Sequence, residues 1–412
     1  MTTWPSPNTR AVQCCIVGAG PAGMMAGLLL ARVGVSVLVL EKHADFLRDF
    51  RGDTVHPSTL EIMHELGLYD EFLKRPHSEV QRMRLRIGAF EVVAADFSRL
   101  PTRAKFVAMM PQWDFLDFLA TEAHRYPNFE LLMRTSVTSL NTSGTNVTGV
   151  AATTLGRPFT VTSDLVLGCD GRHSVVRQQA GLAIQDFGAP IDVLWFRVTR
   201  APGDGEDFSA NLASGHIHIA FNRGDYWQCA FVIAKGGFEA IKARGLEAAR
   251  ADIAKLAPHL ADRMGEIKNF DDMKLLTVGV DRLTTWHKPG LLCIGDAAHT
   301  MSPIGGVGIN LAIQDAVAAA NILATPLAAG TLTDADLARV QARRLRPTKI
   351  IQSLQVQFQK RIISGVLAST SELQPPTALK ILARFPALAR LPARLIGLGY
   401  RPEHVAAIAA AP

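Results

Sequence analysis

The stretch "VQCCIVGAGPAGMMAGLLLARVGVSVLVLE", residues 12–41, decides the fold. Residues 12–17 are apolar and read as a short buried strand, and residues 24–34 have the small and apolar composition of a buried helix. Residues 35–41 alternate β-branched side chains like a second strand. A strand, turn, helix and strand in this order predict an α/β fold built on a parallel sheet.

Three glycines in this stretch, Gly18, Gly20 and Gly23, have the spacing of a dinucleotide-binding turn. The first permits a tight turn, the second lets backbone approach a pyrophosphate, and the third lets helix and strand pack closely. The helix that follows offers free N–H groups to phosphates. Glu41 ends the second strand, where an acid would bind ribose hydroxyls. The next residue, Lys42, is also expected to bind the cofactor. A glycine turn without a ligand is the alternative.

A second segment, "LLCIGDAAHTMSPIGGVGINLAIQDA" (291–316), indicates which dinucleotide is bound. Asp296 ends a late apolar strand, as a ligand for further hydroxyl groups would, and a glycine loop and a helix start follow it. This arrangement suits the distant half of a long ligand and favours FAD over NAD. Alternatively, Asp296 only caps a turn.

The remaining chain predicts a two-domain α/β protein. Residues 161–171 read as another strand, 190–235 as an antiparallel block, 238–257 as one helix, and 309 onward as helices. We expect a discontinuous Rossmann-like FAD-binding domain, an antiparallel β-sheet domain for the substrate, and C-terminal helices. The expected boundaries are 1–77, 103–186 and 271–340 for the first, 78–102 and 187–270 for the second, and 341–412 for the helices.

Composition restricts the function classes. The chain has 412 residues, of which 48% are apolar and 19% charged, as in soluble globular proteins. The N-terminus has no apolar signal segment, so we expect a cytoplasmic protein. The net charge of +6 suits an anionic ligand, but basic residues do not interleave with aromatic ones, and nucleic-acid binding is not expected.

Two further features concern partners and metals. Arginines among apolar residues near the C-terminus predict an amphipathic helical tail packed on the body, and membrane association is not expected. The five cysteines fit no zinc-site spacing, so they predict small buried side chains and no metal site. The sequence gives no indication of the oligomeric state.

Three motifs together resemble a known family. "GAGPAG" (18–23), "GCDGRHSVVR" (168–177) and "GDAAHTMSPIGGVGIN" (295–310) resemble the signatures of single-component FAD-dependent aromatic monooxygenases, the para-hydroxybenzoate hydroxylase-like family. The resemblance covers residues 12 to 330, and "FRGDTVHPSTLEIMHELGL" (50–68) adds to it.

The resemblance implies roles for individual residues. Glu41 would bind the adenosine ribose, Asp296 the ribityl hydroxyls, and Asp170 both FAD and NAD(P)H, although Asp170 could instead cap its strand. Pro303 would lie near the reactive face of the flavin. The other residues expected at the cofactor are Arg51, Gln112, Gly308, Ile309 and Asn310.

The resemblance also implies the reaction. NADH or NADPH would reduce FAD, reduced flavin would react with O2 to a C4a-hydroperoxide, and its distal oxygen would hydroxylate a phenol-like or polyketide-like aromatic molecule. We find no second strand–GxGxxG–helix unit, so NAD(P)H would visit a groove transiently. The alternatives are a ring-oxygen inserting or quinone-biosynthetic monooxygenase, and a non-redox binding protein on an FAD-type fold.

The substrate is expected on the middle sheet. If "GHIHIAFN" (215–222) is a strand, its even-numbered residues share one face. The candidates for the catalytic pocket are Pro303, His218, Asn222 and Trp227, and a buried histidine could orient or deprotonate a phenol. Each histidine, His216 included, could instead have no catalytic role, and His299 is expected to be structural. Trp195 and Arg197 are further candidates. Arg223 falls in a turn, so no arginine is placed for a substrate carboxylate.

Overall fold

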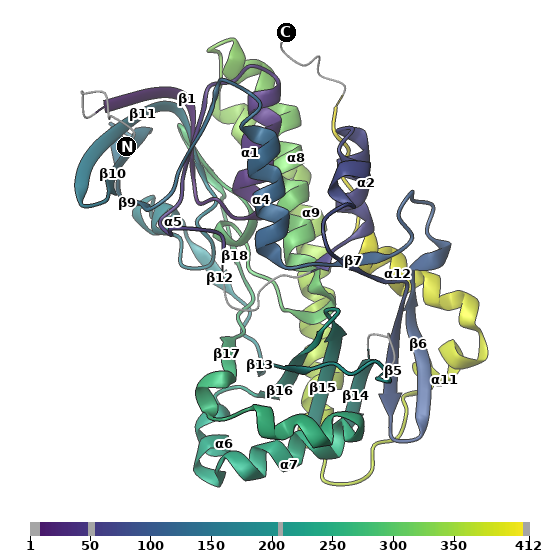
Figure 1. Ribbon diagram of the computed structural model, residues 1–412. Coiled ribbons are helices and arrows are strands. Elements are labelled where there is room, and N and C mark those ends of the chain that lie inside the picture. Colours follow the sequence, from purple (N-terminus) through teal and green to yellow (C-terminus); the bar gives the residue numbers. More distant parts are fainter. Residues whose placement is uncertain (1–8, 48–53, 205–208, 407–412) are drawn as a thin grey trace.

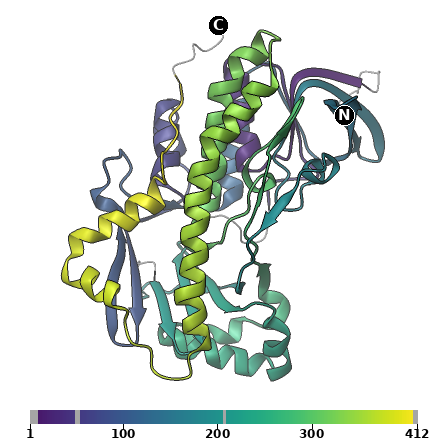
Figure 2. The ribbon, with the colours of Figure 1, turned by 180° about the vertical axis from the view of Figure 1, so that it is seen from behind.

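The computed structural model describes residues 9–47, 54–204 and 209–406, and the expected cofactor residue Arg51 lies outside them. Within these ranges the chain forms two large sheets joined by one long helix (Figures 1 and 2).

The first sheet has eight strands. Along its main path the order is β19 (His287–Lys288), β20 (Leu291–Cys293), β11 (Arg157–Gly168), β1 (Thr9–Val17), β2 (Val37–Leu40) and β8 (Phe129–Leu132). β1 pairs in parallel with β11 and β2, as residues 12–41 predict. The antiparallel hairpin of β9 (Thr135–Ser143) and β10 (Asn146–Thr154) pairs with β11. The last residues of β1 are buried on both faces, which is typical of a central parallel strand.

Helices cover this sheet. α1 (Pro21–Arg32) packs between α4 (Gln112–Ala123) and α8 (Val307–Ala328), while the short α5 (Val175–Gln179) follows β11. The segment Ile304–Ala328 is long and apolar enough to cross a membrane, but 78% of its most apolar window is buried, as in the core helix of a globular fold. All five cysteines are buried and free, which confirms the expectation of small buried side chains.

The second sheet has seven strands. Their order is β17 (Lys274–Thr277), β13 (Ile191–Thr199), β16 (Tyr226–Ala234), β15 (His216–Asn222), β14 (Ser209–Ala213), β5 (Arg82–Ile87) and β6 (Phe90–Asp96). All of these strands pair antiparallel except β14 with β5.

The second sheet has two differently covered faces. One is covered by α6 (Phe238–Arg244), α7 (Leu246–Leu256) and the 3₁₀ segment η2 (Pro258–Glu266). The single helix expected over 238–257 is therefore wrong, because Gly245, with φ at 87°, separates α6 from α7. The opposite face packs against Ile304 and the end of the long helix.

Smaller elements connect the two sheets. β3 (Thr54–Val55), β7 (Val107–Met109) and β4 (Ser78–Val80) form a three-stranded sheet, and β12 (Ile184–Asp186) pairs with β18 (Asp281–Leu283). α2 (Pro57–Glu65) packs against α3 (Tyr69–Phe72) and α8. The 3₁₀ turn η1 (Phe97–Arg99) follows β6, and η3 (Phe270–Asp272) precedes β17.

The C-terminal quarter begins with α9 (Asp334–Phe358), which runs from the first sheet to the second (Figure 2). It continues through one π-helical turn, η6 (Gln359–Ile363), into α10 (Ser364–Ala368). The chain then forms α11 (Thr377–Arg384), η7 (Pro386–Ala389) and α12 (Arg390–Gly397), which pack on β6, and it returns to the first sheet.

Candidate functional site

The glycine turn between β1 and α1 is built by close approach. A Cβ atom on Gly23 would lie 2.0 Å from the carbonyl oxygen of Gly18, and one on Gly18 would lie 2.5 Å from that of Cys169. By contrast, a Cβ on Gly20 would meet no described atom within 4 Å. The N-terminus of α1 has no side-chain cap, so its first N–H groups can bind an anion. The space at Gly20 therefore fits a pyrophosphate.

Glu41 faces this turn from the end of β2. One of its carboxylate oxygens accepts a hydrogen bond from the backbone N–H of Ala19 at 3.0 Å, and the other accepts from the N–H of His43 at 3.0 Å. Burial would raise the pKa of Glu41, but the hydrogen bonds from His43 and Ala19 outweigh it and lower the pKa below its ordinary value. Glu41 is thus an ionised acceptor beside the glycine turn, while the neighbouring Lys42 is exposed.

Asp170 lies on the other side of the turn, at the end of β11. Its Oδ2 accepts from the N–H of Val176 at 3.1 Å, while Oδ1 is buried and has no hydrogen-bond partner within the described ranges. Burial raises the pKa of this carboxyl. The Cβ that Gly18 lacks would lie 2.9 Å from Asp170 Cα. A buried acceptor without a partner fits a hydroxyl donor supplied by a ligand in the turn.

The second motif meets the first. β20 leads into the 3₁₀ turn η4 (Gly295–Ala297), in which Gly295 has φ at 58°. A Cβ on Gly295 would be 3.1 Å from Ala22 in α1 and 3.2 Å from Ala312 in α8. The half-buried Asp296 is therefore held beside the start of α1, as a ligand for a molecule spanning both motifs should be.

The N-terminus of α8 forms a further part of the site. Gly306, in the left-handed region at φ 63°, precedes α8, and its carbonyl accepts from Thr54 Oγ1 at 3.1 Å. Asn310 Oδ1 accepts from the hydroxyls of Ser58 and Thr59, so this side chain fixes α2 to α8. The side chain of Asn310 is thus engaged by α2.

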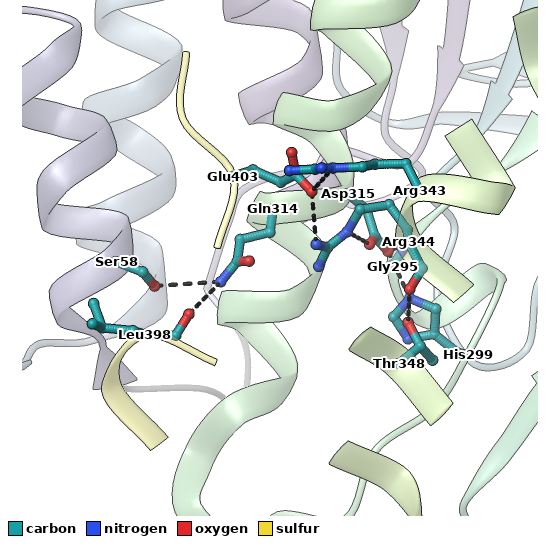
Figure 3. A network of polar contacts seen from close by, with 10 residues as sticks. All are labelled: Ser58, Gly295, His299, Gln314, Asp315, Arg343, Arg344, Thr348, Leu398 and Glu403. Carbon is teal, nitrogen blue, oxygen red and sulfur yellow. Dashed lines mark hydrogen bonds and ion pairs between the residues drawn. The ribbon is translucent and has the colours of Figure 1, made fainter. Parts of the chain in front are cut away.

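A buried ionic network supports the second motif (Figure 3). Asp315 Oδ2 accepts from the N–H of Gly295 at 3.1 Å and lies 2.6 Å from His299 Nε2, while Oδ1 accepts from Arg344 Nε at 2.8 Å. Burial would raise the pKa of Asp315, but His299 and Arg344 lower it below its ordinary value. Glu403, near the C-terminus, accepts from Arg344 Nη1 at 3.1 Å. His299 packs on Trp286 in this network.

Three glutamines on one face of α9 and η6, which we call the glutamine row, hold the loop that contains Pro303. Gln352 Nε2 donates to the carbonyl of Thr300, and Gln355 Nε2 donates to those of Ser302 and Ile304. Gln355 Oε1 also accepts from the N–H of Ser302, and Gln359 Nε2 donates to Ser302 Oγ at 2.6 Å. The row fixes Ser302 and Ile304 on both sides of Pro303, which precedes the 3₁₀ turn η5 (Ile304–Gly306).

Sequence reasoning missed both of these supports. Their signals were present as charged residues in α8 and α9 and as polar amides at positions 352, 355 and 359. Positions three, four and seven residues apart share a helix face, so the three amides lie in one row. Such a row is a signal for hydrogen bonds between the helix and a neighbouring loop. Gln112 is the half-buried first residue of α4, and Gly308 and Ile309 lie in the first turn of α8.

The expected pocket residues of the second sheet lie on the face that the helices cover. His218 is buried beside Phe196 in the cluster that packs on α7, and His216 lies 3.7 Å from Asp252 of α7. Trp227 contacts His259 in η2. By strand alternation, Asn222 shares this helix-covered face. Because apolar Ala220, Cys229 and Phe231 lie on it too, this face attracts the helices that directly follow β16.

The opposite face of the second sheet lies against Ile304, in the loop that follows Asp296. Trp195 and Phe221 stack there with their ring centroids 5.9 Å apart, and Ile219 and Ile304 pack in the same cluster as Trp195. Trp195 Nε1 is buried and has no acceptor in the part of the chain that the structure describes. Arg197 is exposed two residues further along β13. The half-buried Pro303 is adjacent to Ile304, so the sheet and the cofactor loop meet at this apolar surface.

Comparisons with known proteins agree with this architecture. A family model described as FAD binding domain matches residues 11–352. The 6-methylpretetramide 4-monooxygenase of Streptomyces rimosus is 32% identical over 394 residues, which cover 94% of this chain and 93% of that protein. The 12-dehydrotetracycline 5-monooxygenase/anhydrotetracycline 6-monooxygenase of Streptomyces rimosus subsp. rimosus is 30% identical and matches 73% of this chain, but only 60% of its own length.

A solved structure shows the same fold. Anhydrotetracycline hydroxylase from Streptomyces rimosus superimposes with a TM-score of 0.74 at 23% identity, covering 95% of this chain and 77% of that one. The paired glycine turn, the acids at three strand ends and the family match over most of the chain lead to one conclusion: the chain belongs to the FAD binding domain family and is an FAD-dependent monooxygenase.

Proposed function

We propose that the enzyme hydroxylates an uncharged, extended aromatic molecule of the phenol or polyketide type, with NADH or NADPH as the electron donor. The observation that carries this proposal is the pair of Trp195 and Phe221 on the face of the second sheet that meets Ile304. Stacked aromatic side chains suit a flat, apolar substrate. The buried Nε1 of Trp195 can donate a hydrogen bond to a substrate oxygen.

Comparison supports the same class of substrate. Two of the relatives are named for 6-methylpretetramide and for 12-dehydrotetracycline and anhydrotetracycline. Arg223, the cation nearest the predicted pocket in sequence, donates Nε to Gln228 within its own hairpin.

The cofactor residues belong to the same proposal. FAD would lie with its pyrophosphate at Gly18, Gly20 and Gly23, and its hydroxyls would reach Glu41, Asp170 and Asp296. When bound, FAD supplies the electron transfer and oxygen activation. Contacts from Lys42, Gln112 and the backbone of Gly308, Ile309 and Asn310 complete the proposed set. The task left to the chain is to orient the substrate and keep water from the reacting atoms.

We also propose the division into domains expected from the sequence and a cytoplasmic location, without a nucleic-acid partner. The two sheets support the division, since the first carries the glycine turn and the second carries Trp195, although β17, which falls in the range expected for the FAD-binding domain, pairs in the second sheet. Product analysis by mass and NMR distinguishes ring hydroxylation from ring-oxygen insertion and from hydroxylation of a quinone precursor.

The test replaces Trp195 with phenylalanine, which keeps a ring and removes the N–H. FAD content should stay unchanged, while kcat/KM for the accepted phenol or polyketide falls roughly 3- to 10-fold, as for one lost hydrogen bond. The share of consumed NAD(P)H whose electrons form hydrogen peroxide should rise. Trp227→Phe on the opposite face is the matched control, and it should leave this share unchanged. Equal effects of both substitutions would overturn the assignment of the substrate face.

A further inference from the structure

The C-terminal lobe, residues 373–402 with α11, η7 and α12, has an unusual composition. It contains five basic residues and no acidic residue. It also exposes large apolar side chains at short spacing: Ile381 is 48% exposed, Phe385 55%, Leu388 39% and Leu391 58%. Exposed apolar residues on a monomer are usually scattered singly, so this concentration within eleven positions indicates a contact surface.

The lobe packs on the body with its small residues. Ala389, Ala393 and Gly397 are buried. A Cβ on Gly397 would lie 3.1 Å from Leu100 and 3.2 Å from Phe97, so the last turn of α12 sits very close to η1. A helix that merely covers a core turns its large apolar residues inward. Here the side chains of Leu388 and Leu391 are exposed to solvent, where a partner can contact them.

Exposed basic side chains alternate along the lobe with the exposed apolar ones. Lys380, Arg384, Arg390 and Arg394 are all exposed, and Arg384 lies over the ring of Phe385 at 5.6 Å. The ion pairs among the described residues involve none of these four cations. The lobe thus exposes apolar and basic side chains together, and it lies at one side of the molecule beside β5 and β6 (Figure 1).

The charge decides which partner fits. A two-fold pairing with a second copy of this chain would place the same basic residues against one another, which is unfavourable. An anionic lipid surface offers negative phosphates beside an apolar layer, and the lobe exposes the basic and apolar groups that would bind each. This differs from the expectation drawn from the sequence, in which the tail only packs on the body, because sequence does not give the exposure of each side chain.

We propose that the C-terminal lobe docks the enzyme on an anionic membrane surface. Ile381, Phe385, Leu388 and Leu391 would enter the headgroup layer, and the four cations would lie at the lipid phosphates. Such docking would present the enzyme to substrates that dissolve in the bilayer.

The experiment uses the full-length protein with FAD bound. Sedimentation with vesicles of phosphatidylcholine alone is compared with sedimentation in equal parts of phosphatidylcholine and phosphatidylglycerol. We expect binding to the mixed vesicles only, weakened by salt. Phe385→Ser with Leu391→Ser should lower the bound fraction at least tenfold, and so should Arg384→Gln with Arg390→Gln. Leu354→Ser with Phe358→Ser changes exposed apolar residues of α9 and should bind like the wild type.

Three results would overturn the proposal: no binding to the mixed vesicles, equal binding to both kinds, or unchanged binding in the lobe variants. Size-exclusion chromatography gives the competing answer. A dimer that dissociates in the Phe385→Ser, Leu391→Ser variant would assign the lobe to a second copy instead. FAD content measured in every variant separates loss of docking from loss of folding.

Discussion

His218 illustrates how far one side chain depends on its surroundings. It is fully buried, and neither ring nitrogen has a hydrogen-bond partner among the described residues. Burial, with a smaller contribution from His259, lowers the pKa of His218 to about 3 from its ordinary 6.5. The folded protein therefore keeps this ring neutral at pH values where the unfolded chain protonates it.

The consequence is a loss of stability in acid. Between pH 6.5 and about 3 the unfolded state binds one more proton at His218, so the free energy of unfolding falls as the pH falls. At pH 5 this residue should account for about 2 kcal/mol. Urea unfolding gives the free energy of unfolding at pH 7 and at pH 5. In His218→Leu, the loss of this free energy between the two pH values should be smaller than in the wild type by that amount. An identical difference in both proteins would contradict the low pKa.

The same variant tests the substrate face that we propose for the second sheet. Because His218 lies toward α7, His218→Leu should leave the yield of product per NAD(P)H unchanged at pH 7. A large fall in that yield, with normal FAD content, would return the substrate to the helix-covered face.

At the scale of elements, the glutamine row fixes the loop between Thr300 and Ile304. In Gln355→Leu, this loop loses three hydrogen bonds, of about 1 kcal/mol each, and gains a slightly shorter apolar side chain. We expect Pro303 and Ile304 to shift and kcat to fall roughly tenfold or more, since small misplacements at a reaction site are costly. The FAD spectrum should change with it, while KM for NAD(P)H stays similar.

Gln341 provides a matched control on the same helix. It accepts from the N–H of Trp286 and donates to the carbonyl of Thr284, far along α9 from the glutamine row. Gln341→Leu should lower stability by a similar amount and leave kcat and the FAD spectrum as they are. If both variants lose kcat equally, the row has only a general stabilising role.

Elements also show what could be predicted from the sequence. The turn from β1 into α1 was predictable because its determinants, Gly18, Gly20 and Gly23, are local. For β15, alternation separated the two faces correctly, but which face the helices cover depends on packing between distant elements. The contacts of Gln355 and Asp315 join residues from about 20 to 50 positions apart, and no local pattern encodes those distances.

At the scale of the whole molecule, the chain end closes the structure. After the C-terminal lobe the chain returns to the first sheet, where Glu403 accepts from Arg343 Nε at 2.7 Å and from Arg344 Nη1 at 3.1 Å. Asn321 of α8 donates to the carbonyl of His404. Arg344 in turn holds Asp315, which bonds Gly295 beside the proposed FAD site. Glu403 is thus linked to the cofactor motif through the side chains of Arg344 and Asp315.

Glu403→Ala should therefore act over a distance. Removing Glu403 takes one of two buried carboxylates from Arg344, which keeps Asp315, so we expect a cost of about 2–3 kcal/mol. We expect that loss in urea unfolding, together with weaker FAD retention on dialysis. Arg339→Ala, which breaks an exposed pair with Asp336, should cost less than about 1 kcal/mol. Equal costs for the two substitutions would show that the strap formed by residues 399–406 contributes little.

The buried cysteines have a consequence for an enzyme that handles oxygen. In a flavin monooxygenase, turnover without a fitting substrate releases hydrogen peroxide close to the protein. Peroxide oxidises thiolates far faster than thiols. Burial raises the pKa of Cys15 to about 12 and shifts those of Cys14, Cys169, Cys229 and Cys293 in the same direction. All five sulfurs thus remain protonated and enclosed. We therefore expect the five thiols to react slowly with peroxide released in turnover without a substrate.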